Sequence, residues 1–292
     1  MGGEPPHPLP VSEPAPAKVN LFLRVLGRRG DGFHDIETLI QPITLADGIR
    51  ASHREVGFGL SIAGEGAAAV PGGPENLVLR AAEALAASVG ERRGANLLLA
   101  KRVPVAAGLA GASADAAATL RALDRLWGWG LGVQGLHEVA ASVGSDVPAL
   151  LGGGPVVARG RGEVLEPAGT PRTWWAIVPL AFGIAARDAY GWWDRDEGPT
   201  GPDPSRLFDA LRSADLQAVG RLLFNDLEGP VAARREQVGR VRDSLLEEGA
   251  LGAVMCGSGP TVAALARDGT HATELAERVG GRAVSSMLGL PR

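Results

Sequence analysis

Apolar and polar residues alternate in two stretches near the start of the chain. From Ala17 to Leu23 every second residue is apolar, and residues 36–45 resume an apolar pattern after the turn G-R-R-G-D-G. Alternation at a period of two is typical of a strand with one buried face, which here leaves Lys18 and Asn20 together on the opposite face. We therefore expect an antiparallel hairpin with a long loop.

The rest of the chain mixes strand and helix periods without a repeating strand–helix–strand order. Further strands are predicted at residues 57–63, 95–101, 155–160, 163–167, 174–179, 252–256 and 262–266. Helices are predicted at residues 76–89, 133–143, 188–193, 204–213, 215–223, 231–248 and 272–279, and another ends near Trp127. This order indicates the α+β class, with a domain boundary near residues 160–170.

Composition narrows the classes of function. The 292 residues carry a formal net charge of −4 with acids and bases interspersed, which gives no support for a nucleic-acid or acidic-membrane partner. The single cysteine, Cys256, excludes an intramolecular disulfide and fits a reducing cytoplasm. No apolar run reaches the length of a membrane span, and the proline-rich residues 1–14 are predicted to form a disordered leader.

Small residues fill the stretch P-V-A-A-G-L-A-G-A-S-A-D-A-A-A at residues 104–118. Ser113 is a natural N-cap for the helix that follows, and Asp115 is expected in its first turn, where a negative charge suits the helix dipole. A loop without bulky side chains lets a ligand approach the backbone, and a helix start presents unpaired N–H groups to it. The pattern fits a phosphate site and a tight turn beneath a buried helix equally well.

Three separated segments carry a resemblance to a known family. P-A-K-V-N-L-F-L at residues 16–23, the small-residue loop, and G-S-G-P-T at residues 257–261 match the three signatures of the GHMP kinases. Four further segments, G-R-R-G-D-G-F-H-D-I-E-T-L, G-S-D-V-P, G-R-G-E and N-D-L-E, resemble the branch of that family whose acceptor is a CDP-linked methylerythritol. The matches follow the family's order over nearly the whole chain after the leader.

This resemblance implies ATP-dependent phosphorylation of the acceptor's 2-hydroxyl, with ATP and Mg²⁺ as cofactors, in the non-mevalonate synthesis of isoprenoid precursors. It also implies the GHMP kinase fold, with a ribosomal-S5-like N-terminal domain at residues 15–165 and a ferredoxin-like C-terminal domain at residues 166–292. The active site is expected between these domains. We expect a cytoplasmic monomer or weak homodimer that acts on small molecules.

Two residues are candidates for catalysis. The resemblance places the strand face of Lys18 at the active site, where an ammonium can neutralise the transferring phosphoryl group, although a lone lysine on a strand is often simply solvated. It makes Asp146 the general base that accepts the hydroxyl proton, within reach of Lys18. On the residues alone, Asp146 equally fits an N-cap of the short helix that contains Pro148.

The resemblance also assigns residues that bind the acceptor. Phe33 stands where the family commonly has tyrosine, and a cytosine is expected to stack between Phe33 and Tyr190. Phe182 is the alternative to Tyr190, and His34 is expected to hydrogen-bond the base edge. The other substrate contacts are expected from Asn20, Gly257, Ser258 and Gly259.

The small-residue loop is the expected ATP site, and it departs from the family pattern at three positions. Ala110 and Ala112 replace glycines, and Ala114 replaces a serine. An alanine with positive φ costs about 1 kcal/mol or more, whereas an alanine in a helix is harmless. The expected ATP-binding residues are Pro104, Val105, Ala106, Ala107, Gly108, Leu109, Ala110, Gly111, Ala112, Ser113 and Ala114, with Ser113 also the candidate contact for Mg²⁺.

Other functions stay open on the sequence. Another GHMP kinase, of the homoserine or mevalonate type, shares the three signatures, but the pairing of Lys18 with Asp146 argues against homoserine kinase. A non-catalytic binder of a nucleotide or small molecule accounts for the altered loop. An RNA-binding protein with the S5-like fold is disfavoured by the net charge.

Overall fold

The chain folds into two compact units, seen in a computed structural model that describes residues 8–290. The first unit takes the described residues up to Pro16 together with Ala46–Val105 and Gly111–Leu151. The second takes Ala17–Leu45, Ala106–Ala110 and the described chain from Gly152 onward. The two long strands β1 (Val11–Arg28) and β2 (His34–Arg54) therefore contribute to both units. The division at residue 165 follows chain order and stays a prediction.

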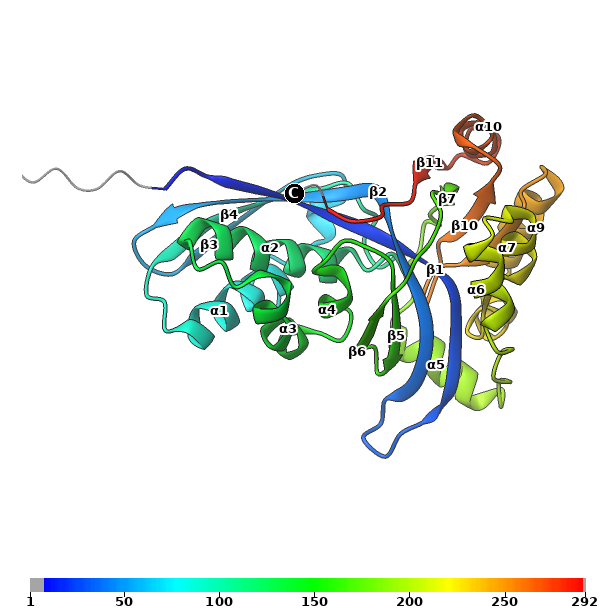
Figure 1. The fold of residues 1–292 in the computed structure, drawn as a ribbon, viewed down its shortest axis with the longest axis horizontal. Coiled ribbons are helices and arrows are strands. Elements are labelled where there is room, and N and C mark those ends of the chain that lie inside the picture. Colours follow the sequence, from blue (N-terminus) through cyan, green and yellow to red (C-terminus); the bar gives the residue numbers. More distant parts are fainter. Residues whose placement is uncertain (1–7, 291–292) are drawn as a thin grey trace, which may run out of the picture. The chain divides into compact units, whose positions relative to one another are not determined.

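The first unit packs helices against strands. Besides parts of β1 and β2, it contains β3 (Phe58–Gly64), a 3-10 turn (Ala67–Ala69), α1 (Leu77–Val89), β4 (Gly94–Lys101), α2 (Gly111–Trp127), α3 (Gly132–Val143) and α4 (Val147–Leu150). β3 pairs in parallel with β4, which pairs antiparallel with the end of β2. In Figure 1, the four helices of this unit lie together on one side of these strands, and α2 is buried over most of its length.

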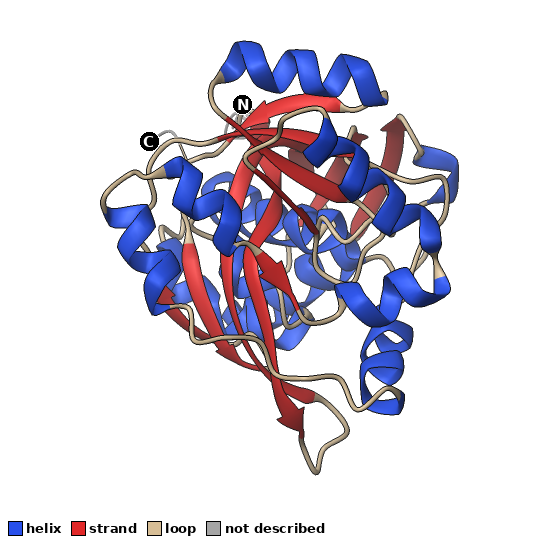
Figure 2. Cartoon of the chain, turned by 90° about the vertical axis from the view of Figure 1, so that its right-hand side faces the viewer, coloured by secondary structure: helices blue, strands red, loops and turns tan. Residues whose placement is uncertain are grey.

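The second unit contains the hairpin of β1 and β2 and a separate four-stranded sheet. The hairpin loop projects at the bottom of Figures 1 and 2, β2 pairs antiparallel with β5, and β1 pairs in parallel with β8. The separate sheet is antiparallel, in the order β11-β7-β10-β9. The remaining elements are β5 (Val156–Gly160), β6 (Val164–Pro167), β7 (Trp174–Val178), α5 (Ala186–Arg195), α6 (Ser205–Arg212), α7 (Leu216–Leu222), β8 (Phe224–Asn225), α8 (Glu228–Arg234), α9 (Glu236–Glu247), β9 (Gly252–Met255), β10 (Val262–Ala266), α10 (Gly269–Val279) and β11 (Arg282–Ser285).

The predicted elements are largely confirmed, but the strands β8 and β11 and the 3-10 turn at Ala67–Ala69 were not predicted. β8 spans two residues and β11 four, so neither is long enough to show a period of two. The strands predicted at residues 155–160 and 163–167 form as β5 and β6 and pair antiparallel. None of the helices in the described chain is long and apolar enough to cross a membrane.

β1 corrects the expectation of one buried face. Every residue from Ala15 to Leu23 is buried, including Lys18 and Asn20. The strand lies inside a sheet, between β2 and β8, rather than at an edge. Polar residues can alternate along such a strand when each finds a hydrogen-bond partner in the interior.

The prediction of a disordered leader at residues 1–14 is wrong from Val11 onward. Residues 1–7 lie outside the described part of the chain, but β1 already begins at Val11. Glu13 is 8% exposed and accepts hydrogen bonds from Arg121 and Arg125 of α2. Arg121 also donates to the Pro14 carbonyl oxygen at 2.6 Å, so these contacts fix a segment whose proline content suggested disorder.

Two helix predictions are wrong in their boundaries. Residues 231–248 form two helices, α8 and α9, because Arg235 between them has φ −137° and ψ 71°, outside the helical region. α2 begins at Gly111, so Ser113 lies within its first turn and is not the N-cap. Asp115 consequently falls in the second turn, beyond the helix start that its charge was expected to favour.

Asp115 instead belongs to a buried cluster of charges in the first unit. The Lys101 ammonium donates to Asp115 Oδ2 at 2.9 Å and to Asp47 Oδ2, and Asp47 Oδ1 accepts from the Val103 N–H. Burial alone lowers the pKa of Lys101, but the two carboxylates outweigh it and raise that pKa. Burial raises the pKa of Asp115 to about 7, against the attraction of Lys101.

This cluster makes stability depend on pH. The pKa of Asp115 is raised to about 7 in the folded chain, so between about pH 4 and pH 7 the folded state binds more protons than the unfolded state. The contribution of Asp115 to stability is therefore full below about pH 4 and is lost as the pH rises to about 7, by at most about 1.4 kcal/mol per pH unit.

Urea unfolding of the wild type and of Asp115→Asn at pH 4, 5, 6 and 7 measures this contribution. We expect the wild type to lose stability relative to the variant as the pH rises, because asparagine does not titrate. If the stability of the wild type relative to Asp115→Asn stays constant or rises over this range, the raised pKa of Asp115 is contradicted.

Candidate active site

Lys18, on β1, holds its ammonium inside the second unit. The residue is 5% exposed, and Nζ donates to Asn20 Oδ1 at 2.7 Å and to the Gly108 carbonyl oxygen at 2.6 Å. A buried ammonium is costly unless such acceptors surround it, so these bonds define where Nζ lies. Lys18 is therefore not the solvated lysine that the sequence alone allowed.

Asn20 ties β1 to the glycine turn at residues 257–261. Its Oδ1, besides accepting from Lys18, accepts the Gly257 N–H at 3.0 Å. Its Nδ2 donates to Thr38 Oγ1 at 2.8 Å, and that hydroxyl donates to the Phe22 carbonyl oxygen at 2.6 Å. Together these hydrogen bonds orient the Asn20 amide with its oxygen toward Lys18.

The three segments that carry the family resemblance meet around Lys18. Its backbone N–H donates to the Leu109 carbonyl oxygen at 3.2 Å, and the Thr261 N–H donates to the Ala107 carbonyl oxygen at 3.4 Å. Parts of residues 16–23, 104–117 and 257–261 therefore lie side by side within the second unit. Among the predicted acceptor residues, the structure thus brings together Asn20 and the turn that contains Gly257, Ser258 and Gly259.

Two glycines permit this close approach. Gly108 has φ 75°, and a Cβ there would lie 2.1 Å from the Cys256 carbonyl oxygen. Gly257 has φ 53°, and a Cβ there would lie 2.8 Å from Lys18 Nζ. Any larger residue at either position would push the loop or the turn away from the ammonium.

Asn225 is a site residue that sequence reasoning did not assign. Its Nδ2 donates to the carbonyl oxygens of Met255 and Gly257, both at 2.8 Å, and its Oδ1 accepts the Leu227 N–H at 3.0 Å. It therefore links the glycine turn and the strand before it to the start of the chain segment that leads into α8. The only signal in the sequence was the N-D-L-E segment, which fits a helix cap equally well.

Cys256, beside the turn, is a buried free cysteine. Burial raises the pKa of its thiol to about 12, although the charge of Lys18 opposes the rise. The thiol stays protonated at neutral pH, and a thiol in that state is a poor nucleophile.

The backbone of the small-residue loop alternates in handedness. Ala106, Gly108 and Ala110 have φ of 53°, 75° and 55°, while Ala107 and Leu109 between them are not in the positive-φ region. Successive N–H groups converge on one side of a loop with this alternation, which is the geometry of anion-binding nests. Two of the three positive values fall on alanines, where they cost about 1 kcal/mol or more each.

The three alanine replacements therefore differ in their consequences. Ala110 carries the strain of a left-handed conformation, whereas Ala112 and Ala114 lie in α2, where alanine is favourable. Gly111–Ala114, including the half-buried Ser113, belong to the first unit with Pro104 and Val105, and Ala106–Ala110 belong to the second.

Asp146 lies in the first unit, at the N-cap position of α4. Its side chain accepts no capping hydrogen bond, and the residue is exposed. The expected position at the helix start is confirmed, but the capping role that the sequence allowed is not observed. The Asp146 carboxylate is therefore not used to cap α4.

The predicted nucleotide-binding residues lie in the second unit. The rings of His34 and Tyr190 stack, with centroids 4.8 Å apart and planes 24° from parallel. Phe33 is 51% exposed, and the Arg161 guanidinium lies 5.1 Å from the centre of its ring. Phe182 packs near Arg235, at 5.9 Å. The structure joins His34 to Tyr190 directly, which the sequence did not predict, and the cytosine stack stays a prediction.

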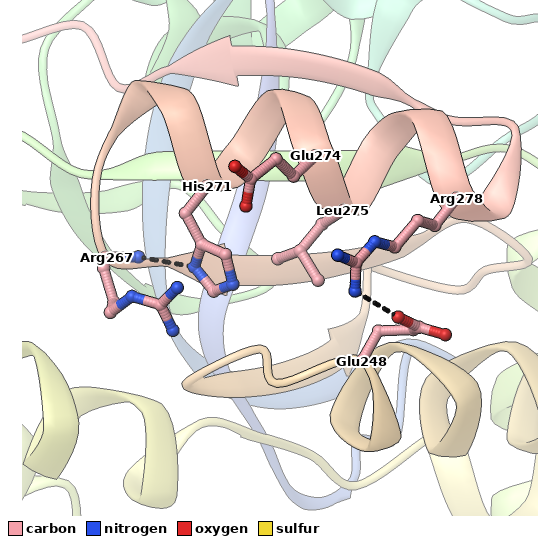
Figure 3. Close-up of a pocket in the computed structure, with 6 residues that line it drawn as sticks. All are labelled: Glu248, Arg267, His271, Glu274, Leu275 and Arg278. Atoms are coloured by element: carbon pink, nitrogen blue, oxygen red, sulfur yellow. Dashed lines mark hydrogen bonds and ion pairs between the residues drawn. The ribbon is translucent and has the colours of Figure 1, made fainter.

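A small polar cavity of about 100 Å³ lies away from these residues (Figure 3). Arg267, His271 and Arg278 line it together with Glu248, Glu274 and Leu275. Arg278 pairs with Glu248 at 2.6 Å, and the Arg267 N–H donates to His271 Nδ1 at 3.2 Å. Because the carboxylates offset the arginines and none of the predicted site residues lines it, this cavity is not the candidate site.

Two domains of one known enzyme family match the chain. The GHMP kinases N terminal domain matches residues 76–154, and the GHMP kinases C terminal matches residues 207–285. Together with the fold and the three segments around Lys18, these matches show that the chain belongs to the GHMP kinases. The expected α+β class and GHMP kinase fold are confirmed.

Within the family, the chain is similar to proteins of one activity. It is 42% identical to a 4-diphosphocytidyl-2-C-methyl-D-erythritol kinase of Moorella thermoacetica over 91% of this chain and 93% of that protein. A crystal structure of 4-(cytidine 5'-diphospho)-2C-methyl-D-erythritol kinase matches with a TM-score of 0.82 and 33% identity, over 96% of this chain and 100% of that one. A homoserine kinase from Cytophaga hutchinsonii shares the fold, with a TM-score of 0.70 at 19% identity, over 99% and 97% of the two chains.

The left-handed conformation of Ala110 predicts the effect of a glycine there. Ala110→Gly should stabilise the chain by about 1 kcal/mol, because glycine adopts positive φ without the steric cost of Cβ. The matched control is Ala112→Gly, which should lower stability by up to about 1 kcal/mol, because it places glycine in a helix. Urea unfolding followed by circular dichroism measures both, and equal losses in the two variants would show that Ala110 is not left-handed.

Proposed function

We propose that the chain transfers the γ-phosphoryl group of ATP to the 2-hydroxyl of 4-diphosphocytidyl-2-C-methyl-D-erythritol. The relatives that support this choice of acceptor are 42% and 33% identical over nine-tenths or more of this chain. The observation that carries the proposal is the meeting of the three signature segments around the buried ammonium of Lys18. The second candidate, a kinase for homoserine, is favoured only by a likeness of fold.

Lys18 is the proposed electrostatic catalyst. Enzymes that transfer phosphoryl groups act mainly by positioning the reactants and by neutralising charge that spreads over the transferred oxygens. A preorganised ammonium is effective because its orientation is already set before the reaction. The bonds from Nζ to Asn20 and Gly108 support this role, since they hold the charge in one place.

Asp146 is the proposed general base. A base must present a carboxylate oxygen to the hydroxyl proton, and Asp146 is exposed and makes no capping bond in its own helix. The acceptor hydroxyl would give its proton to this carboxylate as its oxygen attacks the γ-phosphorus of ATP, with ADP leaving.

The nest at residues 106–110 and the first turn of α2 are the proposed binding site for the ATP phosphates. Alternating φ signs and the unpaired N–H groups of a helix start suit an anion. Among the described residues, no three His, Cys, Asp or Glu side chains gather into a metal site. Mg²⁺ that arrives with ATP would neutralise phosphate charge, and the half-buried Ser113 hydroxyl in the first turn of α2 fits as its protein contact.

The acceptor's cytosine is proposed to bind near the β1–β2 hairpin loop. Phe33 offers an exposed aromatic ring, and Tyr190 and His34 lie stacked beside each other in the same unit.

We further propose that the chain works in the cytoplasm, since its single buried cysteine agrees with a reducing compartment. We propose that it acts there as a monomer or weak homodimer.

An assay of phosphoryl transfer with purified chain tests the proposal, and Asp146→Asn tests the base. Transfer to the CDP-linked acceptor is expected, with none to homoserine or mevalonate. Asp146→Asn should lower kcat about 100-fold or more with the acceptor KM little changed, because the amide cannot accept the proton. The matched control is Glu138→Gln, which likewise replaces an exposed carboxylate of the first unit with a neutral amide.

Acceptor binding without turnover would instead support a non-catalytic binder, and a near-normal kcat in Asp146→Asn would reject that residue as the base.

Removal of the Tyr190 ring should weaken acceptor binding. Tyr190→Ala should raise the acceptor KM about tenfold, because stacking of a base on an aromatic ring contributes roughly 1–3 kcal/mol. The KM for ATP should not change, and it serves as the internal control. Phe182→Ala is measured beside it. If only Phe182→Ala raises the acceptor KM, then Phe182 rather than Tyr190 completes the stack.

A further inference from the structure

Helix α5 presents one face to the ring of His34. Tyr190, Trp193 and Asp194 are three and four residues apart, so they project from the same side of the helix. The Tyr190 ring stacks on His34, and the Trp193 ring meets it edge-on, with centroids 6.0 Å apart and planes at 88°. Asp194 Oδ1 lies 2.8 Å from His34 Nε2. With its side chain 9% exposed, the imidazole is held in one orientation.

The contact with Asp194 determines which ring nitrogen carries the proton. A carboxylate has no proton to donate, so the hydrogen bond to Asp194 requires an N–H at His34 Nε2. In the neutral imidazole the other nitrogen, Nδ1, is then a bare acceptor. The second oxygen of Asp194 lies 3.8 Å from the Arg28 guanidinium, on the side of the carboxylate away from its bond to the ring.

A fixed acceptor at Nδ1 distinguishes the two pyrimidine bases. Cytosine carries an amino group at C4, which donates a hydrogen bond, whereas uracil carries a carbonyl oxygen there, which only accepts. An acceptor nitrogen therefore attracts the cytosine edge and faces a lone pair on uracil. If a site hydrogen-bonds a donor of one ligand but faces only an acceptor of the other, the second ligand leaves polar groups unpaired. Such a site can discriminate strongly between the two ligands.

Resting on the proposed function, we propose that Asp194 is a positioning residue that makes the acceptor site select cytosine over uracil by holding His34 in the Nε2–H tautomer. Asp194 acts through His34 and does not itself touch the acceptor. The carboxylate two residues further on, Asp196, is bonded to Arg234 at 2.6 Å and has no hydrogen bond with His34. Asp196→Asn is therefore a matched control that removes a nearby charge of the same kind.

The tautomer can be read without any substrate. Two-bond ¹⁵N–¹H correlation spectra of the full chain, recorded at about pH 8 where an ordinary imidazole is neutral, distinguish the two ring nitrogens. The His34 signals, assigned by their loss in His34→Gln, should show the Nε2–H tautomer in the wild type and in Asp196→Asn. In Asp194→Asn they should shift toward a mixture, because an amide can either donate to or accept from the ring. An Nδ1–H tautomer in the wild type overturns the proposal.

The base preference is measured as kcat/KM for the CDP-linked acceptor divided by kcat/KM for its UDP-linked counterpart. Asp194→Asn should lower this ratio at least about tenfold, through a higher KM for the CDP-linked acceptor, with kcat and the KM for ATP unchanged within about twofold. Asp194→Glu, which keeps a carboxylate on a longer stem, should retain more of the preference than the isosteric Asp194→Asn. A purely structural role predicts the reverse order, because asparagine preserves the packing better.

The outcomes separate this proposal from the function on which it rests. If the wild type transfers no phosphate to the CDP-linked acceptor, the proposed function fails, whatever the spectra show. If the wild type is active and Asp194→Asn keeps the full cytosine preference, the role of Asp194 fails while the proposed function stands. A reduced preference in Asp196→Asn equal to that in Asp194→Asn also overturns it, since loss of any nearby charge would then suffice.

Discussion

The burial of the Lys18 ammonium is the constraint on which the candidate site depends. A charge at this depth in the second unit requires oxygen acceptors, and they come from a side chain on the same strand and from the backbone of a loop about ninety residues away. The loop can come this close only because Gly108 and Gly257 lack side chains. One buried charge thus explains an asparagine, two glycines and the approach of three distant segments.

The same loop stores backbone strain. Ala106 and Ala110 adopt a handedness that alanine disfavours, and with Gly108 between them they give the loop the alternating φ signs that are typical of anion-binding nests. A loop with negative φ at both alanines would avoid this cost but would lose the alternation. The chain thus keeps an unfavourable local conformation at Ala106 and Ala110, whereas the alanine replacements at 112 and 114 lie in α2, where they carry no such cost.

The second unit contains a further arrangement of distant residues, around the ring of His34. His34 comes from the start of β2, whereas the residues that surround its ring come from α5, about 160 positions later. The sequence marked Phe33, His34 and Tyr190 separately, as aromatic and polar residues near expected positions. It could not show that Asp194 contacts His34, because a carboxylate near the end of a helix usually remains in solvent.

Local patterns were sufficient for most elements, since periods of two and of 3.6 residues depend only on which face is buried. They failed where the tertiary environment overrode them. β1 is buried on both faces, Arg235 interrupts a helical pattern, and β1 extends into a proline-rich segment because Glu13 pairs with arginines of α2.

The sequence by itself determined the family and the α+β class, and it singled out Lys18 and the segments rich in small residues as candidates for the site. These conclusions follow from residue type and order. Only the tertiary structure decided that Lys18 is buried, that Ala110 alone among the three replacements is strained, and that Asp194 contacts His34. Each of these depends on the φ of one residue or on atoms brought together from distant parts of the chain.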